Sequence, residues 1–565
     1  MRFPLAILLP LLFSPVLLPA QSKEAADPVL ATMRQEMNRS LATLKKQPVP
    51  PYFLAYELTD NHAISVRSSF GALMGVSDSH SRLLDLDLRV GTLDSDNTHR
   101  LRGGSPETTF GQIRGTIPLD DDPEALAVGL WLETDRHYKQ VVQRLQAVKT
   151  ESNIKTNTTE DDKLPDFSTA PAEAYTEPIA PFSFDKAAWE ERVRRYGAVF
   201  AGLPDIQSAD VTASGEIETR RYVNSDGSEL RMSSPLYRLD ISASIKAPDG
   251  EVLPLYRSFL AVHPAGLPSD ADLMKAVEEM KTTLLALRQA PVAEPYTGPA
   301  ILSGRASAVF FHEIFGHRIE GDRLRDDDDA QTFKKKINQA VLPKFISVYS
   351  DPTLQSFDGT DLVGYYPFDD EGVKARRVPV VENGIFRNFL LSRTPLKGFP
   401  SSNGHGRRQQ GYDVEARQSN LVVESDMKVT RAQLKKLLIE RVKAAKKPYG
   451  LLFDDITGGF TFTTRSLPNA FAVLPTVVYR VYPDGREELV RGLDLIGTPL
   501  IAFSKISATD NDVGVFNGIC GAESGWVPVS AVAPGMLIDQ IEVQRKEKSE
   551  AQQPVLPPPP TAAAN

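Results

Sequence analysis

Apolar residues return every three or four positions in several stretches of the N-terminal half, which is the spacing of amphipathic helices. The first stretch opens with Asp27 and Pro28, an N-cap residue followed by a proline that suits the first helical turn. Its apolar residues are Val29, Met33, Met37, Leu41 and Leu44. The same spacing predicts further helices over residues 123–149, 186–201 and 270–287, the last of them capped by Ser269 or Asp270.

Other stretches alternate apolar and polar residues, which is the period of a β-strand with one buried face. Residues 84–90, with the sequence Leu-Asp-Leu-Asp-Leu-Arg-Val, show this alternation clearly. Residues 206–262 contain several such runs, separated by the turn sequences Asn-Ser-Asp-Gly (224–227) and Pro-Asp-Gly (248–250), and they predict antiparallel strands. Residues 150–185 are rich in Thr, Asp, Glu and Pro without clear periodicity, and they predict a linker or long loop.

The pattern changes near residue 296. One helix is followed by many short strand-like runs separated by glycine, and a basic amphipathic helix near 430–447 interrupts them. The charges of that helix favour a solvated face over a binding patch. Runs of strands beside a few helices, without regular βαβ alternation, predict an α+β fold. We expect two domains, a mixed helix and antiparallel-sheet domain over 21–295 and a strand-rich domain over 296–547.

The composition fits a globular protein and limits its chemistry. Of 565 residues, 41% are hydrophobic and 24% are charged, which excludes a wholly disordered chain. The chain has 64 Lys and Arg against 73 Asp and Glu, a formal net charge of −9. This acidic balance lacks the positive field that binding to a phosphate backbone needs, so we expect no nucleic acid partner. Cys520 is the single cysteine, which excludes an intrachain disulfide.

Both ends of the chain differ in composition from the two predicted domains. Residues 3–20 are almost continuously apolar, but their four prolines disfavour a spanning helix. Ala20, followed by a polar Gln-Ser-Lys sequence, is typical of a signal-peptidase site. We interpret residues 1–20 as a cleaved signal peptide, with a retained membrane anchor as the alternative, and expect a periplasmic or secreted protein without a stable membrane span. Residues 548–565 are rich in proline and alanine and predict a disordered tail.

The segment most informative about chemistry is His312-Glu313-x-x-x-His317, which follows an apolar helical stretch. It is one residue longer than the His-Glu-x-x-His motif of ordinary zinc peptidases. In a regular α-helix, residues five apart point about 140° away from each other and cannot share a metal. A π-helical turn would return both histidines to one face, and such turns are common at functional sites. We predict a bulged metal-bearing helix in the C-terminal domain, with Gly316 supplying the backbone freedom for the bulge.

Three carboxylates follow the first histidine closely in the sequence. Glu313 lies beside it, where a general base would be needed. Glu320 and Asp322 are candidates for accepting a hydrogen bond from a ligand imidazole, as the outer partners of metal-bound histidines do. Glu320 lies three residues past His317 and is therefore also a candidate metal contact. A solvated acidic helix end explains Asp322 equally well.

Two histidines leave a catalytic zinc one protein ligand short, because such sites usually combine three protein ligands with a water. The chain offers many carboxylates and six other histidines, at positions 62, 80, 99, 137, 263 and 405. It also offers Cys520, which lies between glycines in a segment that is able to approach a metal closely. A thiolate is a strong zinc ligand. The residues alone leave a metal-bound thiolate and a buried free thiol as equal alternatives for Cys520.

In combination, these motifs resemble the TldD/PmbA family of metallopeptidases. The resemblance rests on the histidine motif with its continuation Glu320-Gly321-Asp322. Further matches are Tyr-Thr-Gly-Pro-Ala-Ile-Leu at 296–302, Asp-Asp-Glu-Gly at 369–372, Glu-Asn-Gly at 382–384, Ser-Asn at 419–420 and Cys-Gly at 520–521. The resemblance covers residues 296–545 well, whereas residues 25–295 agree in the order of elements more than in motifs.

The resemblance implies a zinc metallopeptidase with His312, His317 and Cys520 as the ligands of Zn²⁺, and an active subunit because the metal motif is retained. Members of the family trim or degrade peptides and small unfolded proteins in an enclosed cavity, often beside a paralogue that has lost the metal motif. We therefore expect a peptide or unfolded-protein substrate and a homo- or hetero-oligomer. The familiar members are cytoplasmic, so the predicted signal peptide sets this chain apart.

The predicted reaction is hydrolysis of peptide bonds by a metal-activated water, with Glu313 as general base. The alternative is an exported, zinc-stabilised binding or scaffold subunit without turnover, although a structural site has no use for a free carboxylate beside the metal. A zinc hydrolase of non-peptide amides would have the same ligands. Residues 369–371 suit either a cavity wall or an acidic turn. We interpret Arg407 and Arg408 as part of an exposed basic loop, with a contact to a substrate carboxylate as the alternative.

Overall fold

The structure, a computed structural model, describes residues 27–101, 117–154, 163–203, 205–325, 332–461 and 471–546. The predicted signal peptide (1–20) and the predicted tail (548–565) lie outside these residues. Helices and strands are mixed along the described chain, which confirms the predicted α+β class, and the division into two domains stays a prediction. Among the helices that the structure describes, none is long and apolar enough to cross a membrane.

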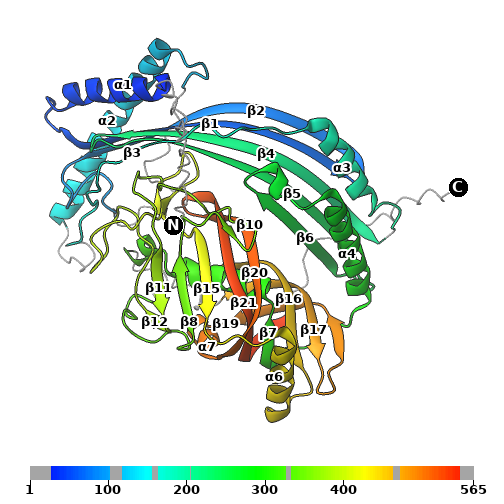
Figure 1. Ribbon diagram of the computed structural model, residues 1–565. Coiled ribbons are helices and arrows are strands. Elements are labelled where there is room, and N and C mark those ends of the chain that lie inside the picture. The colour runs from blue at the N-terminus through cyan, green and yellow to red at the C-terminus, as the bar shows by residue number, and fades with distance from the viewer. Residues whose placement is uncertain are drawn as a thin grey trace, which may run out of the picture.

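Long antiparallel strands form the N-terminal part (Figure 1). Within the described ranges they make a six-stranded sheet of order β2-β1-β4-β5-β3, in which β6 also pairs with β5. The strands are β1 (Pro51–Ser69), β2 (Ala72–Val90), β3 (Ala174–Thr176), β4 (Ile206–Asn224), β5 (Glu229–Lys246) and β6 (Val252–Ala261). The turns predicted at 224–227 and 248–250 are confirmed, because they connect β4 to β5 and β5 to β6.

Helices cover the two ends of this sheet (Figure 1). They are α1 (Pro28–Leu44) and α2 (Pro123–Ile154) at one end, and α3 (Lys186–Ala198) and α4 (Asp270–Gln289) at the other. The side chains of Asp27 and Ser269 cap α1 and α4, as the sequence predicts. Helix α2 continues to Ile154, beyond its predicted end at 149. The predicted apolar stripe of α4 is buried in a core shared with β4 and β5.

The C-terminal part of the chain covers the inner face of the N-terminal sheet, so the polar residues of that face are buried. Residues 84–90 predict one solvated face, but Asp85 is only 2% exposed. The side chain of Arg408 is 11% exposed, lies against this face and donates from Nη2 to Glu57 Oε1 at 3.3 Å. Arg407 is 7% exposed and donates to two backbone carbonyls at 2.7 and 2.8 Å. The prediction of an exposed basic loop is therefore wrong, because buried carboxylates and carbonyls require these guanidinium groups as partners.

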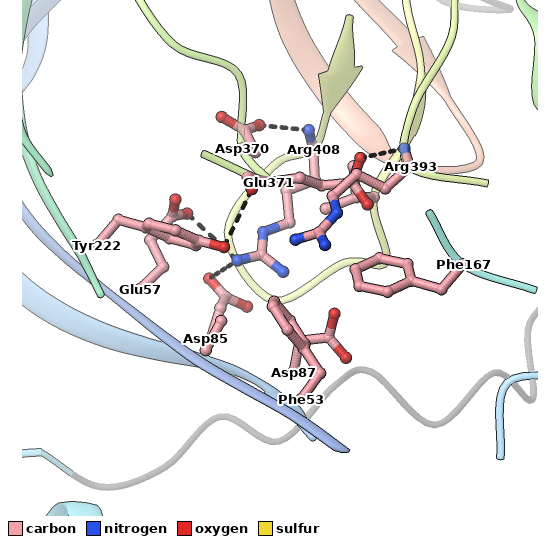
Figure 2. A pocket seen from close by; sticks show the side chains of 12 residues that line it. Phe53, Glu57, Asp85, Asp87, Phe167, Tyr222, Asp370, Glu371, Arg393 and Arg408 are labelled. Atoms are coloured by element: carbon pink, nitrogen blue, oxygen red, sulfur yellow. Dashed lines mark hydrogen bonds and ion pairs between the residues drawn. The ribbon is translucent and has the colours of Figure 1, made fainter. Parts of the chain in front are cut away.

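The acidic segment 369–371 lies where the N-terminal sheet meets the C-terminal part (Figure 2). Asp369 Oδ1 accepts from the backbone N–H groups of Glu371 and Val373, which closes a turn. Asp370 and Glu371 line a small cavity of about 20 Å³. Burial raises the pKa of Asp369 to about 7 and that of Glu371 to about 8. The segment is thus both a turn and a cavity wall.

The predicted linker or loop 150–185 is not a free linker over its described residues 163–185. Phe167 is 2% exposed, and the guanidinium of Arg393 lies 3.9 Å from the centre of its ring. The backbone N–H of Ser168 donates to the carbonyl of Arg393 at 2.8 Å. Residues 174–176 form β3, which pairs with β5 in parallel. This loop therefore joins the two parts of the molecule by packing between them, which its composition does not reveal.

Of the strands that the structure describes, eleven make a second sheet of order β12-β11-β8-β15-β21-β19-β17-β16-β7, with β18 beside β17 and β20 beside β21. An additional pairing of β21 with β7 closes β21, β19, β17, β16 and β7 into a ring. These strands are β7 (Tyr296–Leu302), β8 (Ile346–Ser350), β11 (Val378–Glu382), β12 (Ile385–Phe386), β15 (Asn420–Ser425), β16 (Gly450–Thr461), β17 (Phe471–Val481), β18 (Glu487–Val490), β19 (Leu493–Gly497), β20 (Ile506–Ala522) and β21 (Gly525–Arg545). Shorter pairs are β9 (Ser356–Phe357) with β10 (Thr360–Asp361) and β13 (Gly406–Arg407) with β14 (Glu415–Ala416).

The short helix α5 (Gly304–Phe310) follows β7 and packs against β16, β20 and β21. Phe310 and Phe311 are fully buried, and their rings contact that of Phe503 in α7 (Pro499–Ser504). Helix α6 (Arg431–Ala444), the predicted basic helix, buries only its apolar stripe. The helix that leads into the histidine motif is therefore embedded in the main core of the C-terminal part.

The contact between α5 and β20 depends on two glycines and predicts a large effect of a small substitution. A Cβ atom at Gly514 would collide with the backbone of Gly304 and Arg305, at the start of α5. We expect Gly514→Ala to destabilise the protein by about 1–3 kcal/mol and to lower its melting temperature. Gly75→Ala is the control, since no described heavy atom lies within 4 Å of its added Cβ. Equal melting temperatures of the two variants would contradict this account.

Candidate metal centre

The histidine motif lies on a helix that changes its hydrogen-bonding pattern part-way. Helix α5 begins at Gly304, with Ser303 Oγ accepting from the backbone N–H of Ala306 at 3.2 Å. The helix continues as a π-helical turn over Phe311–Phe315, in which the N–H of Gly316 donates to the carbonyl of Phe311. The predicted π-helical turn is therefore confirmed.

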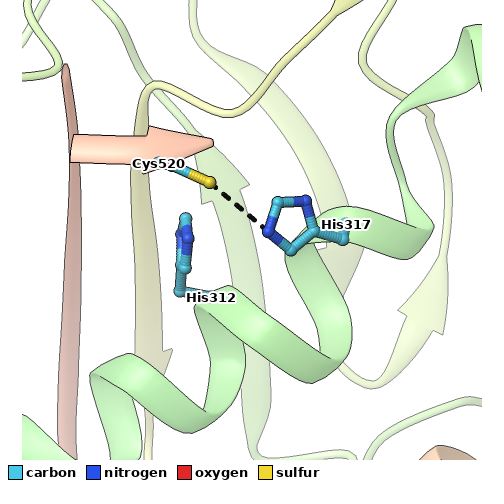
Figure 3. Close-up of side chains that lie close together, drawn as sticks. All are labelled: His312, His317 and Cys520. Atoms are coloured by element: carbon cyan, nitrogen blue, oxygen red, sulfur yellow. Dashed lines mark hydrogen bonds between the residues drawn. The ribbon is translucent and has the colours of Figure 1, made fainter. Parts of the chain in front are cut away.

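The π-helical turn brings both motif histidines to the same side of the helix (Figure 3). Their ring centres are 5.1 Å apart, and both side chains are buried. Cys520, near the end of β20, points toward them, and its Sγ lies 3.4 Å from Nε2 of His317. One ligand atom from each of His312, His317 and Cys520 lies within 4.8 Å of the other two.

Gly316 has a different role from the predicted one. Its φ of −59° is that of an ordinary helical residue, so the π-helical turn does not require the conformational freedom of glycine there. A Cβ atom at Gly316 would instead collide with the side chain of Gln418. The Nε2 of Gln418 donates to the carbonyl of His312 at 3.2 Å. The glycine therefore makes space for a residue that supports the π-helical turn from outside.

Glu320 is the carboxylate that contacts a motif histidine. Its Oε2 lies 3.0 Å from Nδ1 of His317, so Nε2 of the same ring is left to face Cys520. This arrangement is the one by which proteins orient a metal-bound imidazole. Burial lowers the pKa of His317, but Glu320 and Cys520 outweigh it and raise that pKa to about 10. Glu320 is 1% exposed, and burial raises its pKa, but the charge of His317 outweighs this and holds the pKa well below its ordinary value.

A buried arginine that sequence reasoning did not single out joins the two halves of the site. Arg417 lies 3.4 Å from Glu320 Oε1 through its Nε and donates from Nη2 to the carbonyl of Cys520 at 2.9 Å. It also donates to Ser524 Oγ, in the turn between β20 and β21, and to the carbonyl of Gly525, the first residue of β21. One guanidinium thus fixes the thiol-bearing hairpin relative to the carboxylate that orients His317. Its position, three residues before β15, carries no local signal of this role.

Asp322 lies apart from the histidines. Its Oδ2 accepts from the backbone N–H of Ala416 at 2.7 Å, and both oxygens accept from Ser392 Oγ at 2.8–2.9 Å. Burial raises the pKa of Asp322 to about 6. The structure therefore places Glu320 against a histidine, whereas Asp322 binds a neighbouring segment. For Asp322, both the predicted contact with a ligand imidazole and the alternative of a solvated acidic helix end are wrong.

Glu313 lies on the π-helical turn beside His312 and is only partly buried. Its Oε1 accepts from the backbone N–H of Gly459 on β16 at 3.1 Å, which orients the carboxylate. Burial raises the pKa of Glu313, and the nearby His312 and His317 partly oppose this increase. The pattern is that of a carboxylate able to exchange a proton.

The three residues fit a divalent metal of the zinc type. Two imidazoles and a thiolate are donors that zinc prefers, and they leave one position of a tetrahedral site open. Nδ1 of His312 is buried and has no hydrogen-bond partner among the described residues. Buried ring nitrogens are normally satisfied, so a missing partner is consistent with a ligand at this position.

Comparisons with known proteins find relatives of the part of the chain that carries this site. The family model described as the PmbA/TldA metallopeptidase C-terminal domain matches residues 295–545. Residues 295–545 therefore form a C-terminal domain of the TldD/PmbA family. A metalloprotease of Archaeoglobus fulgidus is 29% identical over 238 residues, which are 42% of this chain and 51% of the relative. A zinc metalloprotease TldD homolog of Saccharolobus solfataricus is 22% identical over 343 residues, which are 60% of this chain and 72% of the relative.

The chain spans about half the length of several curated TldD/PmbA relatives that it matches, the Archaeoglobus fulgidus metalloprotease among them. Solved structures are similar over more of the chain. TldE from Thermococcus kodakarensis has a TM-score of 0.58 at 13% identity, covering 91% of this chain and 100% of its own. A protein of Thermotoga maritima described as a modulator of DNA gyrase has a TM-score of 0.59 at 16% identity, covering 90% and 99%. These structures show that the chain shares the TldD/PmbA fold.

The electrostatics of the site predict an unusually acidic thiol in the metal-free chain. Burial raises the pKa of Cys520, but the charges of His317 and His312 outweigh it and hold the pKa well below that of an ordinary cysteine. His317→Ala removes one of the two charges that lower the pKa of Cys520, whereas the effect of burial remains. The pH at which half of the thiol is deprotonated should therefore rise. The chain has a single cysteine, so the ultraviolet difference spectrum against Cys520→Ser reports this thiolate alone. An unchanged midpoint in His317→Ala would show that the imidazole of His317 does not stabilise the thiolate of Cys520.

Proposed function

We propose that this chain is a zinc-dependent metallopeptidase that hydrolyses peptides or small unfolded proteins. One observation carries the proposal. The buried ligand atoms of His312, His317 and Cys520 lie within 4.8 Å of one another, and Glu313 lies on the same π-helical turn. The names of curated relatives, metalloprotease and zinc metalloprotease, support it.

The proposed mechanism divides the work between the metal and the protein. When bound, Zn²⁺ supplies Lewis acidity that polarises a carbonyl and lowers the pKa of a water. His312, His317 and Cys520 would hold it, and Glu320 orients the imidazole of His317 from the far side of the ring. Glu313 would accept a proton from the attacking water and deliver it to the leaving amine. Its hydrogen bond from the β16 backbone keeps the carboxylate in place between the two transfers.

Location and assembly belong to the same proposal. Residues 1–20 have the composition of a signal peptide, which supports a periplasmic or secreted enzyme. The resemblance to the TldD/PmbA family supports an oligomer of this chain with itself or with a paralogue that lacks the metal motif. N-terminal sequencing of the protein recovered from the cell envelope or the medium tests the cleavage.

The role of Glu313 predicts that metal binding and turnover can be separated. Glu313→Gln retains the size of the side chain and the metal ligands, so it should retain zinc while losing peptidase activity on a peptide library. Cys520→Ser is the matched comparison, because losing a ligand should reduce both zinc content and activity. Zinc is measured by elemental analysis of the purified chain. Full activity in Glu313→Gln would overturn the assigned role, and zinc without turnover in the unaltered chain would favour the scaffold alternative.

The positions of Glu320 and Asp322 predict that two similar substitutions affect zinc affinity to different extents. Glu320→Gln removes the charge that orients His317, and loss of such an outer partner typically weakens metal affinity by about 10–100-fold. Asp322→Asn removes the charge of a carboxylate five residues after His317, and the partners of Asp322 among the described residues are Ser392 and Ala416, not a histidine. We therefore expect the zinc affinity of the Asp322→Asn variant to stay close to that of the unaltered chain. Competition with a chromogenic chelator measures both affinities, and equal losses would contradict the geometry.

A further inference from the structure

A second group of metal-binding residue types lies on the N-terminal sheet, outside the candidate metal centre. His62 on β1 and His80 on β2 are directly paired across the two antiparallel strands. Asp78 is paired with the residue two positions after His62, so it lies diagonally across from that histidine. Residues that are paired or two apart on a strand share one face of the sheet. The three side chains therefore project together from the hairpin.

The three side chains are already in contact. The imidazole rings of His62 and His80 are stacked with their centres 3.7 Å apart, and Nε2 of His62 lies 2.9 Å from Oδ1 of Asp78. One ligand atom from each residue lies within 4.8 Å of the other two, the same limit that the three residues of the candidate metal centre satisfy. His62 is half-buried, whereas Asp78 and His80 are exposed.

Two neighbours define the surroundings of this group. The ring of Phe182 packs edge-on against His62 with the ring centres 5.0 Å apart, which restricts the rotation of that imidazole. Nζ of Lys186 lies 2.5 Å from Oδ2 of Asp78, the carboxylate oxygen that does not contact His62. The carboxylate thus faces a cation on one side and an imidazole nitrogen on the other.

We propose that His62, His80 and Asp78 form a second metal site, open to solvent, for a divalent transition-metal cation. Two imidazoles and one carboxylate are the donor set of Zn²⁺, Ni²⁺ and Cu²⁺, whereas Ca²⁺ and Mg²⁺ prefer oxygen ligands alone. Ligand atoms around a tetrahedral zinc are about 3.3–3.5 Å apart, so ligand atoms that lie within 4.8 Å of one another need to approach by at most about 1.5 Å. Exposed side chains are free to do so by small rotations, and water completes the coordination.

A cation bound at this second site would act on the β1–β2 hairpin and not on the candidate metal centre. Its ligands bridge β1 and β2, so a bound cation would link the two strands of the hairpin at its outer face. Lys186 competes with the cation for the charge of Asp78. Removal of that lysine should therefore strengthen metal binding, an effect that a purely structural ion pair between Lys186 and Asp78 does not predict.

The test uses the full chain with the candidate metal centre disabled by His312→Ala and Cys520→Ser. Calorimetric titration with Cu²⁺, and separately with Zn²⁺, should give one site per chain, with Cu²⁺ binding more tightly. Adding His80→Ala or Asp78→Asn should weaken binding by about tenfold or more, since each removes one of three protein ligands. Adding Lys186→Gln should tighten it.

The outcomes separate this proposal from the proposed function. Unchanged affinity in both His80→Ala and Asp78→Asn, or weaker binding in Lys186→Gln, would overturn the second site. All of these residues are at least partly exposed, and circular dichroism of each variant checks that it is folded. The peptidase proposal is tested in the chain with an intact candidate metal centre, where His80→Ala should retain full activity. Each proposal is therefore able to fail without the other.

Discussion

The buried contact between Arg417 and Glu320 is the interaction on which the candidate metal centre depends. Its ligands come from a helical turn and from a strand, and His317 and Cys520 are 203 residues apart in the sequence. Arg417 contacts both elements, since it donates a hydrogen bond to the carbonyl of Cys520 and forms an ion pair with the carboxylate of Glu320. Both charged side chains are 1% exposed, so the pair is worth little as net stability, while loss of one member leaves an uncompensated buried charge. Its value therefore lies in fixing the relative position of the ligands.

The π-helical turn solves a second geometric problem at this site. A regular helix would direct His312 and His317 to different sides, and the extra residue of the turn returns them to one. Such turns weaken the helical hydrogen-bonding pattern, so they persist where neighbours support them. Here the support is the hydrogen bond from Gln418 to the carbonyl of His312, which Gly316 admits by lacking a side chain. Consecutive residues, Arg417 and Gln418, thus stabilise the thiol side and the histidine side of the same centre.

The sequence predicted what depends on local pattern and missed what depends on pairing at long range. Helix α1 begins where Asp27 and Pro28 indicate, and the π-helical turn follows from the spacing of the histidines alone. The pairing of Cys520 with them came from family resemblance, because a lone cysteine has no periodicity to interpret. Arg407 and Arg408 were misjudged for the opposite reason. Their local sequence is typical of an exposed loop, but their partners are distant in the chain. Arg408 contacts Glu57, 351 residues earlier, and Arg407 donates to a backbone carbonyl 121 residues later, that of Pro528.

Burial also explains why the two groups of metal-binding residues should differ in strength. In the candidate metal centre the fold itself holds the ligands, since His312, His317 and Cys520 are each 9% exposed or less and their neighbours are hydrogen-bonded. Little conformational entropy remains to be lost when a cation binds. On the hairpin, the exposed side chains of Asp78 and His80 must be ordered at the moment of binding, and Lys186 must give up a partner. With two imidazoles in each group, we therefore expect a tightly held cation where the core has already ordered the ligands, and an exchangeable one where it has not.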